Sequence, residues 1–472
     1  MSILVDLLVK NGVVVTCDPR DRIVRSGAVA VQGSRVVAVG TVEELERAYK
    51  ADREIDATGM VITPGLVNSH THLPMTLFRG VADDIPAIEW LPRIWSIEKN
   101  LTEETCYAGA LLGCLEMIKS GTTCFADQYF HMDQVAKAVE KSGMRAVLAQ
   151  GVLELGDLEK GKEQLKESAD FAREWNGEAE GRIGCKIGPH AIYSCSTGLL
   201  KEARQVANEI AVGLHIHLAE APNEIKMVKE KHGKTPTEHL ANIGFLSPDV
   251  IAAHCIFLDN SDIEILQRTM TGVAHCPSTV MKYGGGISPV PDLVKRGISV
   301  GIGTDGCGSN NNLDMVEEMR TAAFLHKLNR KDATVLPAKT MLKLATIGSA
   351  RAIGLQNEVG SIEVGKRADM ILVDFRKPHL TPFHNVVGHL VYSSFGSDVH
   401  TTIIDGKVVM ENRQVLTLDE DEVMREAQRE FERLLDKGGW SPTMENPSAS
   451  FRSAVSVKII ESYMKIMQMM RG

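Results

Sequence analysis

The stretch "TPGLVNSHTHLPMTLFRG", residues 63–80, places two histidines one residue apart directly after a short apolar run. Residues i and i+2 of a β-strand point to the same face, so His70 and His72 would lie side by side at the end of a strand. Two imidazoles in that position can share one metal ion. Surface histidines without a role give the same short pattern, so the rest of the chain must decide between the two interpretations.

The chain that follows alternates short apolar segments with longer amphipathic ones. "RAVLAQGV" (145–152) and "VIAAHC" (250–255) are typical of buried parallel strands, whereas "LEKGKEQLKESADFAREWN" (158–176) has apolar residues at helical spacing. This alternation predicts βα units around a parallel sheet. Their number favours an α/β fold of the TIM type, a (β/α)₈ barrel, over a smaller open sheet.

Both ends of the chain lack this alternation and have short β-strands instead. "GAVAVQGSRVVAVG" (27–40) and "HTTIIDGKVVMENRQVL" (400–416) are examples, punctuated by glycine and aspartate as in hairpins. We therefore predict a barrel inserted into a small β-sandwich domain that both chain ends build. The predicted divisions are residues 1–63 and 366–420 for the β-sandwich domain, 64–365 for the catalytic barrel, and 421–472 for a C-terminal helical extension.

The last segment, "SVKIIESYMKIMQMMRG", has apolar residues at helical spacing from Val457 to Met467. A helix with such a stripe usually buries it against the body of the protein or against a partner subunit. We expect one of these two arrangements, and the second would make the protein a homo-oligomer. A helix on a membrane surface is the alternative.

The composition is that of an ordinary globular protein, with 472 residues, 44% of them hydrophobic, and a net charge of −9. The sequence has no clustered basic face, so we expect no nucleic-acid partner. No apolar run is long enough to span a membrane. The nine cysteines are scattered without a C-x-x-C pair, which argues against a disulfide framework. Asp6 and Lys10 interrupt the first apolar run too early for a signal peptide, so we expect a cytoplasmic protein.

Further polar residues follow apolar strands, as His70 and His72 do. In a barrel of this kind, chemistry gathers at the carboxyl ends of the strands. One buried histidine is usually a core residue whose nitrogens are hydrogen-bonded within the protein. Several polar residues that all follow apolar strands are poorly explained by coincidence. We therefore predict a metal site. The further residues at strand ends are His217, His254, His275 and Asp305.

Imidazole and carboxylate ligands suit Zn²⁺ or Fe²⁺ without any thiolate. A bound divalent ion lowers the pKa of its water from about 15.7 towards about 7, which supplies hydroxide for attack on an electrophilic carbon. Glu220 follows His217 by three residues, within reach of such a site. It could protonate the substrate atom next to the attacked carbon, and a solvated loop charge is the alternative.

Four segments together resemble the amidohydrolase superfamily, and especially its branch of 5-methylthioadenosine/S-adenosylhomocysteine deaminases. They are "PGLVNSHTHLPMTLFRG", "HIHLAE", "AAHC" and "GIGTDGCGSNNNLDMVEEMR", and the resemblance extends from about residue 5 to about residue 420. It implies one divalent metal ion per chain, with Zn²⁺ preferred and Fe²⁺ the alternative. The ligands that it implies are His70, His72, His217 and Asp305.

The resemblance also implies roles for individual residues in deamination of an adenine ring. Glu220 would donate a proton to N1, His254 would hydrogen-bond the attacking hydroxide, and Asp305 would pass a proton to the leaving amine. Glu98, in "SIEKN", resembles the carboxylate that accepts hydrogen bonds from the ribose hydroxyls. His190, in "GPHAIYSCS", resembles the histidine that contacts the purine ring. The implied partner is therefore a small nucleoside.

Two positions depart from the family pattern. An arginine is expected near the start of the loop after "RAVLAQG", but the segment "VLELGDLEKG" contains none. Arg145 at the start of that strand could instead pack or pair locally. If the missing arginine contacts the 5′ substituent in relatives, this chain would prefer a different 5′ group. Gln128, in "ADQYF", is the second departure, and the sequence alone does not interpret it.

The segment "GIGTDG" (301–306) matches the G-x-G-x-x-G pattern of dinucleotide-binding turns. Asp305 would repel a pyrophosphate there, and the segment comes late, after several other strands, so we do not expect NAD binding. We expect these glycines to let the chain turn tightly at a metal-ligand strand end.

We predict a metal-dependent hydrolytic deaminase of 5′-modified adenosines, such as S-adenosylhomocysteine and 5′-methylthioadenosine, that releases ammonia and an inosine-type product. A guanine deaminase, or an s-triazine aminohydrolase or chlorohydrolase, would use the same ligands, but Glu98 argues for a ribose. A non-catalytic metal-binding barrel is the second alternative. Such a barrel would have no physical reason to keep both Glu220 and His254.

Overall fold

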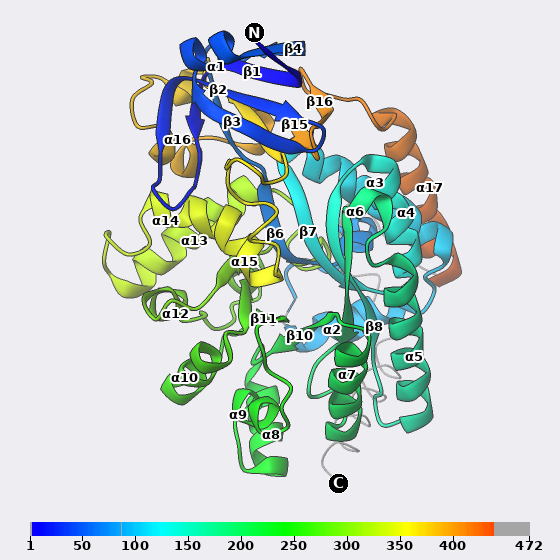
Figure 1. Cartoon of the computed structure of the whole chain (residues 1–472). Helices are drawn as coiled ribbons and strands as arrows, with labels where there is room; N and C mark the ends of the chain where they lie inside the picture. The colour runs from blue at the N-terminus through cyan, green and yellow to red at the C-terminus, as the bar shows by residue number, and fades with distance from the viewer. Residues whose placement is uncertain (1, 86, 439–472) are drawn as a thin grey trace.

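The computed structural model describes residues 2–85 and 87–438, without the side chains of residues 87–89. The predicted apolar stripe from Val457 to Met467 lies outside the described residues. Figure 1 shows a barrel surrounded by helices, with a separate sheet at one end of the molecule where β1–β3 and β15–β16 meet.

The barrel consists of eight parallel strands whose order in space follows their order in the chain. Almost every residue in these strands is buried, because the barrel interior covers one face and helices cover the other. The predicted (β/α)₈ fold is confirmed. The strands are β6 (Leu66–Thr71), β7 (Thr122–Tyr129), β8 (Arg145–Val152), β9 (Ile183–Pro189), β10 (Gly213–Leu218), β11 (Val250–His254), β12 (Gly272–His275) and β13 (Val300–Ile302).

The barrel closes between β13 and β6 through contacts just beyond the end of β13. The backbone N–H of Asp305 donates to the carbonyl of His70 over 3.0 Å. The Asn68 side chain donates to the Thr304 hydroxyl over 2.7 Å and accepts from the Thr304 backbone over 3.1 Å. A Cβ on Gly303 would lie 2.8 Å from the carbonyl oxygen of His70, so a side chain there would push the two segments apart.

Helices connect the barrel strands and cover the outside of the barrel (Figure 1). Helix α3 has clear end signals, because the Thr102 hydroxyl accepts from the backbone of Thr105 and Gly121 ends the helix with a φ of 89°. The helices are α1 (Val42–Ala48), α2 (Ala87–Glu98), α3 (Glu103–Ser120), α4 (Met132–Ser142), α5 (Leu158–Trp175), α6 (Glu178–Gly181), α7 (Thr197–Glu209), α8 (Pro222–His232), α9 (Pro236–Asn242), α10 (Asn260–Thr269), α11 (Pro277–Lys282), α12 (Val290–Lys295), α13 (Met315–Arg330), α14 (Ala338–Lys343), α15 (Ser349–Ile353), α16 (Val386–Tyr392) and α17 (Glu420–Gly438).

Both chain ends build the second sheet, as predicted, and hydrogen bonds join its described strands into one network. The two ends meet where β5 and β14 pair antiparallel, with Ile62 opposite Leu372. The strands are β1 (Ile3–Val15), β2 (Ile23–Gln32), β3 (Arg35–Thr41), β4 (Tyr49–Asp56), β5 (Met60–Pro64), β14 (Met370–Asp374), β15 (Val399–Ile404), β16 (Lys407–Glu411) and β17 (Gln414–Val415).

Gly65 is the single residue between the last strand of the N-terminal segment, β5, and the first barrel strand, β6. A Cβ at this position would lie 2.1 Å from the Thr123 hydroxyl oxygen on β7. No side chain fits there, so glycine lets the chain pass from the small sheet into the barrel while staying close to β7.

Arg145, at the amino end of β8, connects the barrel to the small sheet. Its guanidinium contacts Asp369 and Asp405, each over 2.8 Å, and all three side chains are almost completely buried. Asp369 also accepts from the backbone N–H of Asp405 over 2.7 Å. Arg145 therefore pairs with two distant carboxylates at the end of the barrel opposite to the carboxyl ends of the strands.

The C-terminal helix α17 packs along α3 (Figure 1). Val423, Ala427 and Leu434 are its buried apolar side chains, and Lys119 of α3 pairs with Glu420 over 2.6 Å. Among the described residues, none of the helices has the length and apolarity needed to cross a membrane.

We expect Arg145→Met to lower the free energy of unfolding by about 3–5 kcal/mol, because the change leaves buried Asp369 without its cation and buried Asp405 with Arg367 alone. The shift of the urea unfolding midpoint measures this effect. Arg47→Met is the control, since Arg47 forms an exposed pair with Glu43 that contributes at most about 1 kcal/mol. Equal midpoints for the two variants would contradict the stabilising role of Arg145.

Candidate active site

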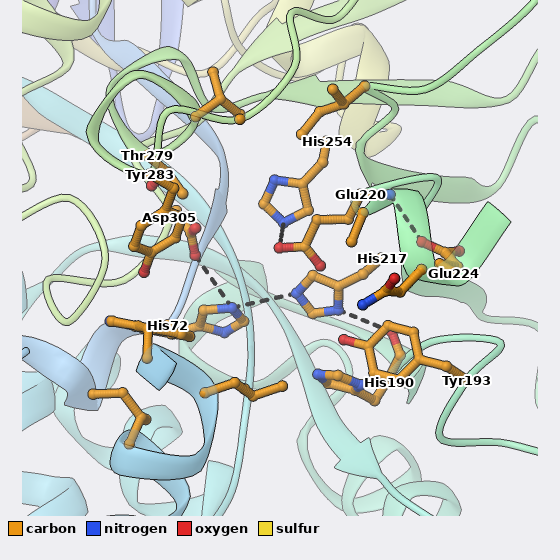
Figure 2. A pocket seen from close by; sticks show the side chains of 18 of the residues that line it. His72, His190, Tyr193, His217, Glu220, Glu224, His254, Thr279, Tyr283 and Asp305 are labelled. Carbon is orange, nitrogen blue, oxygen red and sulfur yellow. Dashed lines mark hydrogen bonds and ion pairs between the residues drawn. The ribbon is translucent and has the colours of Figure 1, made fainter. Parts of the chain in front are cut away.

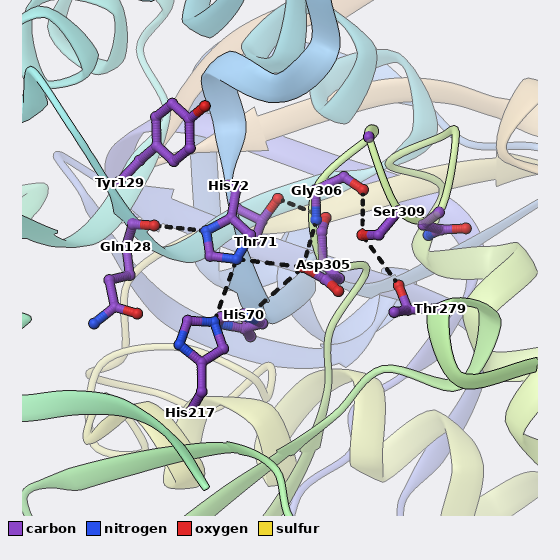
Figure 3. Close-up of polar contacts among 12 residues, drawn as sticks. His70, Thr71, His72, Gln128, Tyr129, His217, Thr279, Asp305, Gly306 and Ser309 are labelled. Atoms are coloured by element: carbon purple, nitrogen blue, oxygen red, sulfur yellow. Dashed lines mark hydrogen bonds and ion pairs between the residues drawn. The ribbon is translucent and has the colours of Figure 1, made fainter. Parts of the chain in front are cut away.

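The predicted metal ligands and acid–base residues lie together at the carboxyl ends of four barrel strands (Figures 2 and 3). They come from β6, β10, β11 and the segment after β13, so residues far apart in the sequence converge on one point. The residues that the fold brings together are His70, His72, His217, Glu220, His254 and Asp305.

Three of these residues form a cluster with the geometry of a metal site. The ligand atoms of His70, His72 and His217 lie within 4.8 Å of one another. The Nε2 atoms of His72 and His217 are 3.4 Å apart. Three imidazole nitrogens at such separations can bind one divalent ion together.

The Nδ1 atoms of two of these histidines hold the rings in place. The Nδ1–H of His72 donates to the carbonyl of Gln128 over 2.6 Å. The Nδ1–H of His217 donates to the carbonyl of His190 over 2.8 Å. Each bond leaves Nε2 as the nitrogen with the free lone pair, and Figure 3 shows the Nε2 atoms of the two rings facing each other.

His70 is completely buried, and its Nδ1 lies 2.9 Å from Nε2 of His215. Within the described chain, its Nε2 has no hydrogen-bond partner. Burial, and then the neighbouring His72 and His217, hold the pKa of His70 well below its usual value. A neutral imidazole with an unpaired buried nitrogen is what a metal ligand requires, so the residues present fit a metal ion.

Asp305 completes the cluster as its carboxylate. Its Oδ1 lies 3.4 Å from Nε2 of His72 and 3.8 Å from Nε2 of His70, and it accepts from the backbone N–H of Gly306 over 2.8 Å. Burial acts to raise the pKa of Asp305, but His72 and His254 outweigh it, so the pKa is lower than usual. Asp305 is therefore an anion at neutral pH.

Glu220 and His254 face each other beside the cluster, with Oε1 of Glu220 3.7 Å from Nε2 of His254 (Figure 2). Burial raises the pKa of Glu220. Burial also lowers the pKa of His254 to about 4, so this imidazole is neutral at physiological pH. A carboxyl group with a raised pKa retains its proton to a higher pH than a free one does, which suits a proton donor.

A cavity of about 650 Å³ opens from this cluster, and apolar side chains form most of its wall. Glu98, the last residue of α2, lines it and accepts from the Tyr129 hydroxyl over 2.7 Å. Burial raises the pKa of Glu98 to about 7. Glu98 therefore offers the cavity a hydrogen-bonding carboxylate away from the metal cluster, in a mostly apolar wall.

His190 also lines the cavity, and its ring centroid is 4.7 Å from that of His217. Its Nδ1 lies 2.9 Å from the Ser194 hydroxyl. Burial, and then His217, hold the pKa of His190 well below its usual value. A neutral ring in this position can hydrogen-bond a heterocycle or stack against it.

The predicted strand-end histidine His275 lies elsewhere. Its Nε2 is 3.1 Å from Nε2 of buried His326, and it does not line the cavity. Like most buried histidines, His275 is therefore part of the packed interior.

The sequence did not reveal the roles of two residues that support the metal cluster, although Gln128 was noted as a departure from the family pattern. His215, two residues before His217 on β10, has the same i, i+2 spacing as His70 and His72, so the signal was present in "HIH". Gln128 had no such signal. Its side-chain amide donates to the carbonyls of His215 and Pro189 over 2.9 and 3.3 Å, which connects β7 to β10 and β9.

The sequence profile of the amidohydrolase family matches residues 61–409, and the chain belongs to this family. The resemblance inferred from the sequence is confirmed, and the protein is a hydrolase that acts on carbon–nitrogen bonds. A profile described as a bacterial imidazolonepropionase-like composite domain also matches residues 27–49.

Named relatives match nearly the whole chain. A 5′-deoxyadenosine deaminase from Methanosarcina mazei is 48% identical over 433 residues, which are 92% of this chain and 99% of the relative. A 5-methylthioadenosine/S-adenosylhomocysteine deaminase from Desulforudis audaxviator is 50% identical over 431 residues, which are 91% and 99%.

Solved structures share the fold. An adenosine deaminase from Xanthomonas campestris with bound zinc has a TM-score of 0.88 and 32% identity, and the match covers 92% of this chain and all of that one (100%). An atrazine chlorohydrolase from Arthrobacter aurescens complexed with zinc has a TM-score of 0.82 and 23% identity, over 90% and 100% of the two chains. The second likeness concerns the fold alone.

We expect His217→Ala to weaken Zn²⁺ binding by more than about a hundredfold, because loss of a ligand costs more than loss of a residue that orients one. Metal analysis after gel filtration checks the zinc content per chain, and the rise in melting temperature on adding Zn²⁺ checks binding independently of activity. His384→Ala is the control, because His384 is exposed and lies outside the cluster. Wild-type zinc content in His217→Ala would contradict the assignment.

Proposed function

We propose that this protein is a metal-dependent deaminase of the adenine ring of 5′-modified adenosines. The substrates would be ribosides such as 5′-deoxyadenosine, 5′-methylthioadenosine and S-adenosylhomocysteine, and the products ammonia and an inosine-type nucleoside. The observation that carries the proposal is the Glu220 carboxyl, whose pKa is raised by burial, facing His254 beside the imidazole cluster. The names of the relatives support the choice of substrate.

His70, His72, His217 and Asp305 would hold one divalent ion, for which Zn²⁺ is our first choice and Fe²⁺ the second. When bound, the ion supplies a nucleophile at neutral pH by lowering the pKa of water from about 15.7 towards about 7. The proposal also keeps the expectation of a reducing, cytoplasmic compartment. The nine cysteines are buried and none of them is in a disulfide bond, which supports it.

The side chains divide the proton transfers between them. Glu220 carries a proton and donates it to N1 of the adenine ring, which makes C6 more electrophilic. His254 directs its Nε2 towards the oxygen that attacks C6 and stabilises it as charge develops. Asp305, an anion beside His72, accepts one of the two protons that this oxygen loses and passes it to the departing amine, and the other proton restores the Glu220 carboxyl. Water and adenine thereby give ammonia and the 6-oxopurine.

Glu98 and His190 would orient the substrate. The Glu98 carboxylate would accept hydrogen bonds from the ribose hydroxyls. It also accepts a hydrogen bond from the Tyr129 hydroxyl, which keeps it in place. His190 contacts the purine ring next to His217. Guanine and s-triazines carry no ribose, so the Glu98 carboxylate in an apolar wall favours a nucleoside over a bare heterocycle.

The residues of the cavity wall also indicate which 5′ substituent the site would accept. The described residues that line the cavity include no lysine or arginine. The residues directly after β7 and β8, Phe130 and Leu153, contribute apolar side chains to the wall. A 5′ carboxylate would find no cation among these side chains, and burying an unpaired charge is costly. We therefore rank 5′-deoxy and methylthio groups above homocysteinyl.

The experiment is ammonia release by the Zn²⁺-loaded enzyme from a panel of 5′-deoxyadenosine, 5′-methylthioadenosine, S-adenosylhomocysteine, adenosine, adenine, guanine and a chlorinated s-triazine. We expect turnover of the ribosides, with the first two having the highest kcat/KM. Turnover confined to guanine or the triazine would overturn the proposed substrate class. A kcat/KM for S-adenosylhomocysteine above that of the two small 5′ groups would contradict the ranking alone.

The KM for 5′-deoxyadenosine should rise as the pH falls below about 7. The Glu98 pKa is about 7, so the carboxylate that accepts the ribose hydrogen bonds is lost by protonation on the acidic side. Glu98→Gln should raise KM by about tenfold to a hundredfold, since a hydrogen bond to a charged group contributes about 1.5–3 kcal/mol. Its KM should also lose this pH dependence. Free adenine is the control substrate, and the same change on adenine would refute the ribose contact.

A further inference from the structure

Glu224 is a buried carboxylate in the cavity wall that the proposed reaction does not use. It lies in the first turn of α8, four residues after Glu220, and its side chain is 3% exposed. Its Oε1 accepts from the backbone N–H of Ala219 over 3.1 Å, and its Oε2 accepts from the backbone N–H of Glu220 over 2.9 Å. One carboxylate therefore holds two consecutive amides of the segment that carries Glu220.

The backbone that Glu224 holds has an unusual conformation. Ala219 has a φ of 51°, in the left-handed region that residues with a side chain rarely adopt. This turn reverses the chain directly after β10. Because the conformation is costly for alanine, surrounding contacts must stabilise it.

Contacts from the opposite side hold the same turn. The carbonyl of Ala219 accepts from the backbone N–H groups of Ile256 and Phe257 over 3.0 and 2.9 Å. These two residues directly follow His254 and Cys255 after β11. The turn is thus held by Glu224 on its N–H side and by the β11 segment on its carbonyl side, which brings Glu220 and His254 to 3.7 Å from each other.

We propose that Glu224 is a positioning residue that fixes the direction of the Glu220 side chain. Figure 2 shows Glu224 to the right of Glu220, with its carboxylate turned to the backbone nitrogen of Glu220 rather than to its carboxyl group. Both Glu224 oxygens are engaged by amides, so Glu224 acts through Glu220 and does not itself exchange protons with the substrate. This inference rests on the proposed role of Glu220 as the proton donor.

Glu224→Gln tests this role with almost no change in side-chain volume. An amide has one acceptor oxygen, and its NH₂ group would face the second backbone N–H, so the turn loses one bond and gains a repulsive contact. We expect kcat to fall by about a hundredfold, the scale of a misplacement of about 1 Å. Zinc content and KM should stay close to the wild-type values. Glu230→Gln, an exposed change on the same helix, is the matched control.

The decisive measurement is kcat for the same change in a Glu220→Gln background. Glu220→Gln alone should lower kcat by about 10²–10⁴-fold, as loss of a positioned proton donor does. If Glu224 acts through Glu220, adding Glu224→Gln should then cost less than about twofold, because the two changes remove the same function. An equal cost in both backgrounds would overturn the inference and assign Glu224 a general structural role.

The outcomes separate this inference from the proposed function. Wild-type turnover in Glu220→Gln would remove the proton-donor role and the inference with it. A strongly impaired Glu220→Gln combined with an additive Glu224→Gln would remove the inference alone.

If Glu224→Gln does not yield folded protein, Glu224→Asp replaces it. The shorter side chain withdraws the carboxylate by one methylene group from the two amides. Its effect on kcat is then compared in the wild-type and Glu220→Gln backgrounds in the same way.

Discussion

The structure depends on the packing of three imidazoles and one carboxylate around a single point. Burial keeps the pKa of His70 and His217 low, so their nitrogens remain available as ligands instead of binding protons. Such a cluster is costly without an ion, and rigid surroundings must hold it. The closure of the barrel supplies them, because the backbone bond between Asp305 and His70 fixes the carboxylate relative to the first two imidazoles of the site.

The same surroundings give two carboxyl groups opposite properties. Glu220 projects from the turn after β10 into an apolar cavity, and burial raises its pKa. Asp305 lies among imidazoles, which outweigh burial and lower its pKa. The raised pKa of Glu220 and the lowered pKa of Asp305 therefore suit an acid and a base within one site, which is the arrangement that acid–base catalysis requires. His254 lies between Glu220 and Asp305. Its ring is neutral, so it does not compete with either carboxyl group for protons.

Residues that stabilise the fold and residues of the candidate active site lie at opposite ends of the barrel. At the amino end, Arg145 and its two carboxylates join the small sheet to the barrel in a fully paired, buried network. At the carboxyl end, polar atoms remain available within the described residues, among them Nε2 of His70. This division is general for barrels of this type, because loops at the carboxyl end can vary without disturbing the strands. It also explains why Arg145, which begins the strand that precedes the segment without the expected arginine, does not line the cavity.

Local sequence patterns sufficed for the barrel, the small β domain and the clustering of the strand-end residues other than His275. The periods of strands and helices and the i, i+2 spacing of His70 and His72 are properties of neighbouring residues, so they are visible in the sequence. Long-range contacts were not visible. Arg145 and Asp369 are 224 residues apart, and the amide of Gln128 crosses to strands whose carbonyls carry no side-chain signal. The partners in such contacts depend on how the strands pack around the barrel. Two distant segments meet only once the fold has closed, so the identity of either residue alone does not predict the contact.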